Sequence, residues 1–225
     1  MEITMNYQIA IDGPAGAGKS TIAKKIAKQK GYIYVDTGAM YRAMALYLIE
    51  EKVKKEDSRQ ISEKCKTADI TIQYEAGEQV VLLNGRNVNG LIRTEEVGNM
   101  ASVSSANPDV RTKLVELQQQ LASTTSVVMD GRDIGTCVLP EADIKIYLTA
   151  SSAVRAKRRY EELTAKGQSC DLDVIEKDII ERDERDMKRE LSPLKQAEDA
   201  ILLDSSCLTI DEVVSKIMEI VEKHV

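Results

Sequence analysis

The sequence predicts an α/β protein with an open, doubly wound parallel sheet, and three observations support that prediction. Five short apolar runs are continuous rather than alternating, as is typical of strands covered on both faces. Stretches with helical spacing separate these runs, so strands and helices alternate along the chain. A glycine-rich segment follows the first run directly and leads into the first helical stretch. The predicted strands are residues 7–11, 32–35, 126–129, 144–148 and 201–203.

Capping residues support several of the helices that separate these strands. The first helix should cover residues 21–30 and end at Gly31, because glycine readily adopts the left-handed conformation that ends a helix. Asn107 followed by Pro108 predicts the start of another helix, since Asn accepts from free backbone N–H groups and proline fits the first helical position. Thr209 should cap the last helix. Helices on both faces of the sheet would make a three-layer core.

A β-rich segment interrupts this alternation. Residues 68–74 and 79–88 are two β-type runs joined by a short connection, which predicts a hairpin. We therefore expect residues 60–101 to form an inserted subdomain, with residues 1–59 and 102–225 forming the core.

A second segment, residues 155–190, is rich in charge and is interrupted by Gly167. Arg182, Arg185 and Arg189 are spaced to share one helix face. One interpretation is a solvated helical pair with ordinary surface ion pairs, each worth a few tenths of a kcal/mol. The other is a helical lid that carries arginines over a bound phosphate chain.

Composition excludes several classes of function. The chain has 225 residues, a net charge of −6 and no apolar run near the 18 or more residues that a membrane span needs. The acidic balance argues against non-specific nucleic-acid binding. Four scattered cysteines form no Cys-x-x-Cys pair, and the one histidine, His224, is next to last, so zinc and histidine chemistry are not indicated. Free thiols and the absence of a secretory signal predict a cytoplasmic protein.

The glycine-rich segment is the most specific motif. Residues 13–20 read Gly-Pro-Ala-Gly-Ala-Gly-Lys-Ser, which matches the phosphate-binding pattern Gly-x-x-x-x-Gly-Lys-Ser/Thr between a strand and a helix. In that pattern backbone N–H groups surround the phosphates, Lys19 reaches the β- and γ-phosphates, and Ser20 can bind Mg²⁺. The alternative is a glycine-rich turn without a ligand. The motif predicts a nucleoside triphosphate site but not the fate of the γ-phosphate.

Polar residues follow two other predicted strands. Asp36, Thr37 and Arg42 come after the second strand, and Arg132 and Asp133 come after the strand that begins at residue 126. Ligands of open α/β sheets bind outside the carboxyl ends of the strands, so both groups should lie near the phosphate loop. The first group could instead cap a helix, and the second could be a simple turn. Together they indicate a second anion site.

Five motifs occur in one order: the phosphate loop, Asp-Thr-Gly-Ala-Met-Tyr-Arg at 36–42, Ile-Arg-Thr-Glu-Glu-Val at 92–97, Asp-Gly-Arg-Asp-Ile-Gly-Thr at 130–136, and the arginines of 182–189. In this combination the chain resembles the bacterial cytidylate kinase family over residues 6 to 222. The resemblance implies a P-loop kinase core with a five-stranded parallel sheet, a small β-rich insert that binds the nucleoside monophosphate, and a helical lid. It also implies ATP-dependent phosphorylation of CMP and dCMP with Mg²⁺, UMP being a poorer acceptor.

The resemblance assigns site residues position by position. It places ATP on Gly13, Pro14, Ala15, Gly16, Ala17, Gly18, Lys19, Ser20 and Thr21, with Ser20 as the metal ligand. It places CMP on Thr37, Tyr41, Arg42, Ser102, Arg111, Arg132, Asp133, Arg182, Asp186 and Arg189. The residues expected to stabilise the transferring phosphoryl group are Lys19, Arg132, Arg158, Arg182 and Arg189.

Within this set, Arg42, Arg111 and Arg132 would hold the phosphate of CMP, and Asp133 and Asp186 would meet the sugar hydroxyls. Two other functions stay open at this point. One is another small-molecule P-loop kinase. The other is a regulatory P-loop NTPase, although the chain has no Asn-Lys-x-Asp motif. We expect a monomer that binds neither nucleic acid nor membranes.

Overall fold

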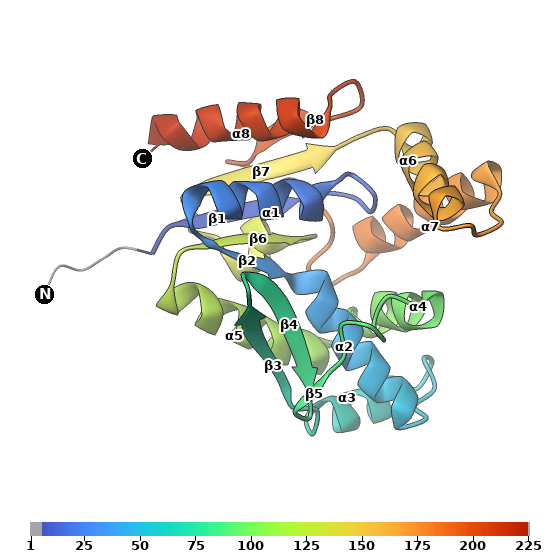
Figure 1. Ribbon diagram of the computed structural model, residues 1–225. Coiled ribbons are helices and arrows are strands. Elements are labelled where there is room, and N and C mark those ends of the chain that lie inside the picture. Colours follow the sequence, from blue (N-terminus) through green and yellow to red (C-terminus); the bar gives the residue numbers. More distant parts are fainter. Residues whose placement is uncertain (1–5, 225) are drawn as a thin grey trace, which may run out of the picture.

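The computed structural model describes residues 6–224, and the expectation about a secretory signal concerns residues outside this range. A five-stranded parallel sheet forms the centre of the fold, in the order β2-β6-β1-β7-β8 (Figure 1). This confirms the predicted sheet, with strand boundaries within two residues of those expected. The strands are β1 (Gln8–Asp12), β2 (Ile33–Asp36), β6 (Val127–Gly131), β7 (Ile144–Thr149) and β8 (Ile201–Asp204).

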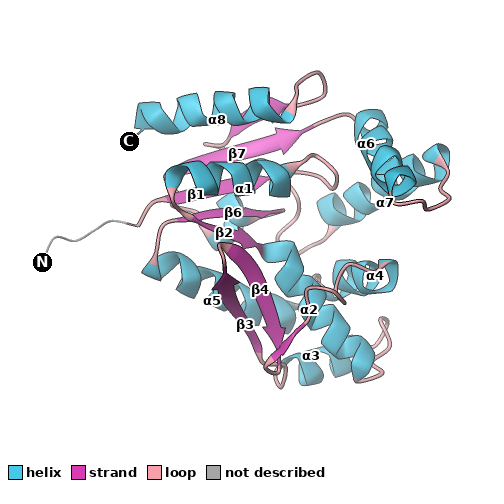
Figure 2. Ribbon diagram, viewed as in Figure 1, coloured by secondary structure: helices cyan, strands magenta, loops and turns pink. Residues whose placement is uncertain are grey.

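Helices cover both faces of this sheet and complete the predicted three layers (Figure 2). Ile9 and Ile11 of β1 pack with the apolar sides of α1 and α8, whereas Ala10 between them belongs to the cluster under α2 and α5. The alternation of side chains along a strand therefore assigns successive residues to two separate cores. The covering helices are α1 (Lys19–Lys30), α8 (Ile210–His224), α2 (Thr37–Glu50) and α5 (Pro108–Thr124).

The predicted caps are confirmed. Gly31 ends α1 with a φ of 70°, the left-handed conformation that its lack of a Cβ permits. The Asn107 side chain accepts from the backbone N–H groups of Asp109 and Val110, and Pro108 is the first residue of α5. At the start of α8, Thr209 and Glu212 accept from each other's backbone N–H groups.

The inserted segment forms a separate antiparallel sheet of three strands, β3 (Ile70–Glu75), β4 (Glu78–Leu83) and β5 (Arg86–Asn87). The predicted hairpin is confirmed, but a single second strand over residues 79–88 was wrong. Asn84 and Gly85 both have positive φ, so an Asn-Gly turn ends β4 and starts β5. Two helices flank this sheet, α3 (Ser58–Cys65) and α4 (Glu95–Ser104). The expected first residue of the insert, 60, lies within α3, and its expected last residue, 101, lies within α4. The division into domains stays a prediction.

The charged segment forms two packed helices, α6 (Ser152–Ala165) and α7 (Leu172–Lys188), beyond the carboxyl end of β7 (Figure 1). Gly167 turns the chain between them with a φ of 72°. None of the helices within residues 6–224 is both long enough and apolar enough to span a membrane.

Candidate active site

The loop after β1 depends on glycine at two positions. Gly13 has a φ of 148°, and a Cβ atom there would lie 1.9 Å from the carbonyl oxygen of Leu148 on β7. Gly18 has a φ of 89° at the N-cap of α1. The loop therefore passes closely over the neighbouring strand and ends at a helix N-terminus, where free N–H groups and the helix dipole favour an anion.

Lys19 is buried at this loop with only loop atoms to bond. Its Nζ donates to the carbonyl oxygen of Pro14 at 2.8 Å. Burial, together with the positive charge of Arg132 nearby, lowers the pKa of Lys19 to about 7. A bound anion would favour the charged form of this lysine, so the site is suited to a phosphate.

Two carboxylates lie beneath the loop, and the sequence-based reasoning assigned a role to neither. Asp130, near the end of β6, accepts from the hydroxyls of Ser20 at 3.0 Å and Tyr34 at 2.8 Å. Burial, then the negative charge of Asp36, raises the pKa of Asp130 to about 6. Asp12, the last residue of β1, accepts from the backbone N–H groups at the start of η1 (Ile134–Val138) at 2.8 and 2.7 Å, and burial raises its pKa to about 6. The sequence signal that could have identified both residues is the position of a carboxylate at or near the end of a strand, next to the loop.

Opposite the loop, a cluster of arginines and carboxylates brings together five of the predicted acceptor residues. Asp133 accepts from Arg111 and pairs with Arg189 at 3.5 Å. Arg132 donates from Nε to Asp186 at 2.9 Å. The side chains of all five are mostly buried, so each charge depends on its partner for compensation. We call these five residues the arginine–aspartate cluster.

Arg182 carries a charge that the structure leaves incompletely compensated. Its Nε is buried without a hydrogen-bond partner. Burial, then the positive charge of Arg132, lowers the pKa of Arg182 to about 10, with Asp186 acting in the opposite direction. An unpartnered buried N–H and neighbouring like charges both favour the arrival of an anion.

Three predicted residues lie around this cluster on α2. Thr37 donates from Oγ1 to the carbonyl oxygen of Asp130 at 2.7 Å. The ring of Tyr41 lies 5.7 Å from the guanidinium of Arg111, a cation–π contact. Arg42 donates to the carbonyl oxygen of Ile92 at 3.2 Å, and burial lowers its pKa. The helix-cap interpretation of the residues after the second strand is confirmed, because Asp36 caps α2 through the Ala39 N–H, and their role in binding a ligand stays a prediction.

The prediction that Arg182, Arg185 and Arg189 share one helix face directed at the site was wrong for Arg185. Arg185 is exposed, whereas Asp183 and Asp186 are buried. The helix packs through positions 182, 183 and 186, and Arg189 follows its last residue. The spacing i, i+3, i+7 alone could not distinguish this face from the adjacent one.

Two other predicted residues, Arg158 and Ser102, make no hydrogen bond to the loop within residues 6–224. Arg158 donates to the hydroxyl and carbonyl oxygens of Ser205 at 3.3 and 2.7 Å, beyond the end of β8. Ser102 lies half-buried on α4. The arginine that contacts the loop from α6 is instead Arg155, whose NH1 donates to the carbonyl oxygen of Ala15 at 2.8 Å. The sequence-based reasoning missed it because nothing in α6 distinguishes residue 155 from residue 158.

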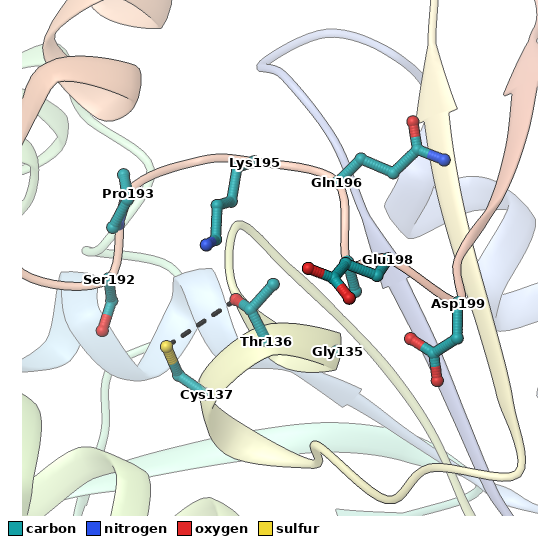
Figure 3. Close-up of a pocket in the computed structure, with 10 residues that line it drawn as sticks. Gly135, Thr136, Cys137, Ser192, Pro193, Lys195, Gln196, Glu198 and Asp199 are labelled. Atoms are coloured by element: carbon teal, nitrogen blue, oxygen red, sulfur yellow. Dashed lines mark hydrogen bonds between the residues drawn. The ribbon is translucent and has the colours of Figure 1, made fainter.

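A cavity of about 360 Å³ lies next to the site, between η1 and residues 192–199 (Figure 3). Thr136, Cys137 and Lys195 contribute to its lining, and none of the predicted nucleotide-binding residues does. The predicted acceptor site is therefore not this cavity but the region occupied by the arginine–aspartate cluster.

Comparison with known proteins identifies the family. The family model described as cytidylate kinase matches residues 9–223. The chain belongs to the cytidylate kinase family. It is 49% identical over 220 residues to a cytidylate kinase of a Geobacillus strain, covering 98% of each chain. It is 48% identical over 215 residues to the cytidylate kinase of Bacillus subtilis, covering 96% of each. The resemblance drawn from the motifs is confirmed.

Solved structures support the fold at much lower identity. An uncharacterised protein from Eubacterium ventriosum superposes with a TM-score of 0.56 at 13% identity, covering 97% of this chain and 99% of that one. A putative kinase from Chloroflexus aurantiacus gives a TM-score of 0.50 at 12% identity, with full coverage of both chains. At such identities these neighbours show the shared architecture of the core and nothing about the acceptor.

Proposed function

We propose that this member of the cytidylate kinase family binds ATP at residues 13–21 and CMP or dCMP at the arginine–aspartate cluster, and transfers the γ-phosphoryl group directly between them. Phosphorylation of CMP and dCMP is the activity of its family. The observation that supports the two-site assignment is the position of Arg132. Its charge acts on Lys19 of the loop, and its Nε bonds to Asp186 of the cluster.

On the acceptor side, the carboxylates keep the arginines ordered until CMP arrives. Arg42, Arg111 and Arg132 would then hold the CMP phosphate, because a guanidinium matches two phosphate oxygens at once. Asp133 and Asp186, released from these arginines, would accept from the sugar hydroxyls. In this way contacts between CMP and the arginines replace ion pairs that already compensate the buried charges of Arg111 and Arg132.

On the donor side, the loop N–H groups and Lys19 would bind the phosphate chain and offset its charge. Arg182 and Arg189 would stabilise charge on the transferring phosphoryl group, and we keep Arg158 as a candidate for the same role. Movement of α6 and α7 over the bound nucleotides would exclude water and so limit hydrolysis of ATP.

The residues beneath the loop also fit Mg²⁺. The Ser20 hydroxyl and the Asp130 carboxylate lie 3.0 Å apart and offer the hard oxygen donors that Mg²⁺ prefers. No group of three His, Cys, Asp or Glu side chains within residues 6–224 could hold a metal by itself, as suits an ion that is bound mainly by phosphates. When bound, Mg²⁺ would neutralise charge on the transferring phosphates. The proposal also includes that the enzyme is cytoplasmic and monomeric. Sedimentation measurements would test its oligomeric state.

The Arg132→Ala variant tests the two-site assignment. We expect CMP-dependent turnover to fall by about 10³-fold while ATP affinity stays within about threefold, because Arg132 serves the acceptor and the transition state. ADP release measures the first quantity and calorimetric titration with ATP the second. Arg185→Ala, an exposed arginine of α7, is the control and should behave like the wild type.

Turnover of Arg132→Ala at the wild-type rate would reject this assignment. A panel of acceptors, CMP, dCMP, UMP, AMP and GMP, separates the proposal from another small-molecule kinase. ATP hydrolysis that is indifferent to all of them would favour a regulatory NTPase.

A further inference from the structure

A carboxylate from α7 occupies part of the phosphate loop. Oδ1 of Asp183 accepts from the backbone N–H of Ala15 at 3.3 Å, and Oδ2 pairs with NH1 of Arg155 at 2.6 Å. The same NH1 donates to the carbonyl oxygen of Ala15 at 2.8 Å. Asp183 is 7% exposed and Arg155 is 6% exposed. Helices α6 and α7 are thus joined to the loop through both polar groups of one residue, Ala15.

The chemistry of this contact resembles that of a bound phosphate. The backbone N–H groups of such a loop are the donors that surround phosphate oxygens. A carboxylate oxygen is also an anionic acceptor, and here it takes the N–H of Ala15. Arg155 is packed against the same loop, since a Cβ atom on Gly16 would lie 3.3 Å from the Cβ of Arg155. The contact therefore lies within the donor site.

We propose that Asp183 competes with a phosphate oxygen for the Ala15 N–H, and that the phosphate chain of ATP displaces Asp183 and takes over Arg155. This inference rests on the proposed function, in which ATP binds to the loop. Asp183 lies directly after Arg182 and three residues before Asp186. Its release would free the helix that carries these acceptor residues, so arrival of the donor is coupled to movement of α7.

The proposal makes opposite predictions for the two members of the pair. Removing the charge of Asp183 leaves Arg155 free for the phosphates, so ATP should bind more tightly. Removing Arg155 leaves an uncompensated carboxylate beside the phosphates, so ATP should bind more weakly. A purely structural role would weaken ATP binding in both variants, because each would disturb the loop.

The test is calorimetric titration without CMP, using ATP with Mg²⁺ and, separately, inorganic tripolyphosphate. For Asp183→Asn we expect the Kd to fall by about fivefold, and for Arg155→Ala to rise by about tenfold, with both ligands. Asp183→Glu restores the charge and should return the Kd toward the wild-type value. Glu184→Gln changes an exposed acid on the same helix and should leave it unchanged.

A Kd that rises in Asp183→Asn as well as in Arg155→Ala would overturn the inference. Should Asp183→Asn not fold, a crystal structure of the wild-type enzyme with ATP decides the matter. The inference requires a phosphate oxygen on the Ala15 N–H with Asp183 displaced, and an unchanged Asp183–Ala15 bond would overturn it. Failure of the wild-type enzyme to bind ATP or tripolyphosphate would instead contradict the proposed function, and the inference with it.

Discussion

The phosphate loop and the arginine–aspartate cluster lie close together but are built in different ways. The loop is one continuous segment, residues 13–20, whose shape depends on the backbone conformation of its glycines and on the absence of a side chain at Gly13. The cluster draws its charges from α5, from the residues after β6, and from α7 and the residue that follows it. The first site is therefore sensitive to added atoms, whereas the second is sensitive to any imbalance of buried charge.

The largest expected effect is that of Gly13→Ala, which adds one carbon to the loop. Its Cβ would lie 1.9 Å from a backbone oxygen of Leu148, at a φ of 148° that side chains rarely adopt. We expect a loss of about 5 kcal/mol in the free energy of unfolding, enough to unfold many domains. Urea denaturation measures it.

The matched control is Gly167→Ala, with a φ of 72° and no atom within 4 Å of the added carbon. It should lose only about 1–2 kcal/mol, the cost of a left-handed alanine. Similar losses in the two variants would show that conformation, and not the close approach to β7, governs the loop.

The next effect concerns the cluster. Asp133→Asn keeps the shape of the side chain but removes the charge that compensates Arg111 and Arg189. We expect a loss of about 3 kcal/mol in the free energy of unfolding, since breaking a buried pair leaves its partner uncompensated. Glu78→Gln, which breaks the exposed pair with Lys24, should change stability by less than about 1 kcal/mol. Equal changes in both variants would contradict the view that the stability of the cluster depends on the balance of its buried charges.

The smallest expected effect is a pH dependence beneath the loop, where carboxyls accept from N–H and O–H groups. Because the pKa of Asp12 is raised to about 6, the native state binds more protons than the unfolded state between pH 4 and 6. The contribution of Asp12 to stability is therefore greatest at the acidic end and is lost as the pH rises through 6. We expect the stability of the wild type relative to Asp12→Asn to fall by up to about 1.4 kcal/mol per pH unit in this window. Urea denaturation at pH 4.5, 5.5 and 6.5 measures it, and a constant difference would contradict the raised pKa.

The sequence predicted the elements of the fold better than the partners within the site. Short continuous apolar runs placed all five strands of the main sheet, and the caps at Gly31, Asn107 and Thr209 were confirmed, because these signals act over a few residues. The residues of the cluster were also predicted, from their place after a strand, from helical spacing and, for Arg111, from the resemblance to a known family. Their pairing was not, since Asp133 is 22 positions from Arg111 in the sequence.

Two arginines whose surroundings the sequence could not indicate show the limit most clearly. Arg185 shares helical spacing with Arg182 but is exposed, and Arg155 rather than Arg158 bonds to the loop. Adjacent faces of a charged helix have similar compositions, so spacing cannot tell which face packs. The packing of α7 against α6 and the loop made that choice.

The sequence by itself determined the α/β alternation, the phosphate loop and, through its motifs, the family. The first two depend on local rules, namely apolar patterns, capping and the conformational freedom of glycine, and the family depends on short motifs read along the chain. Only the tertiary structure decided the strand order, the pairing of arginines with aspartates, and the position of Asp183 on the Ala15 N–H. Buried charges find partners through space rather than along the chain, so their arrangement follows from packing and not from spacing.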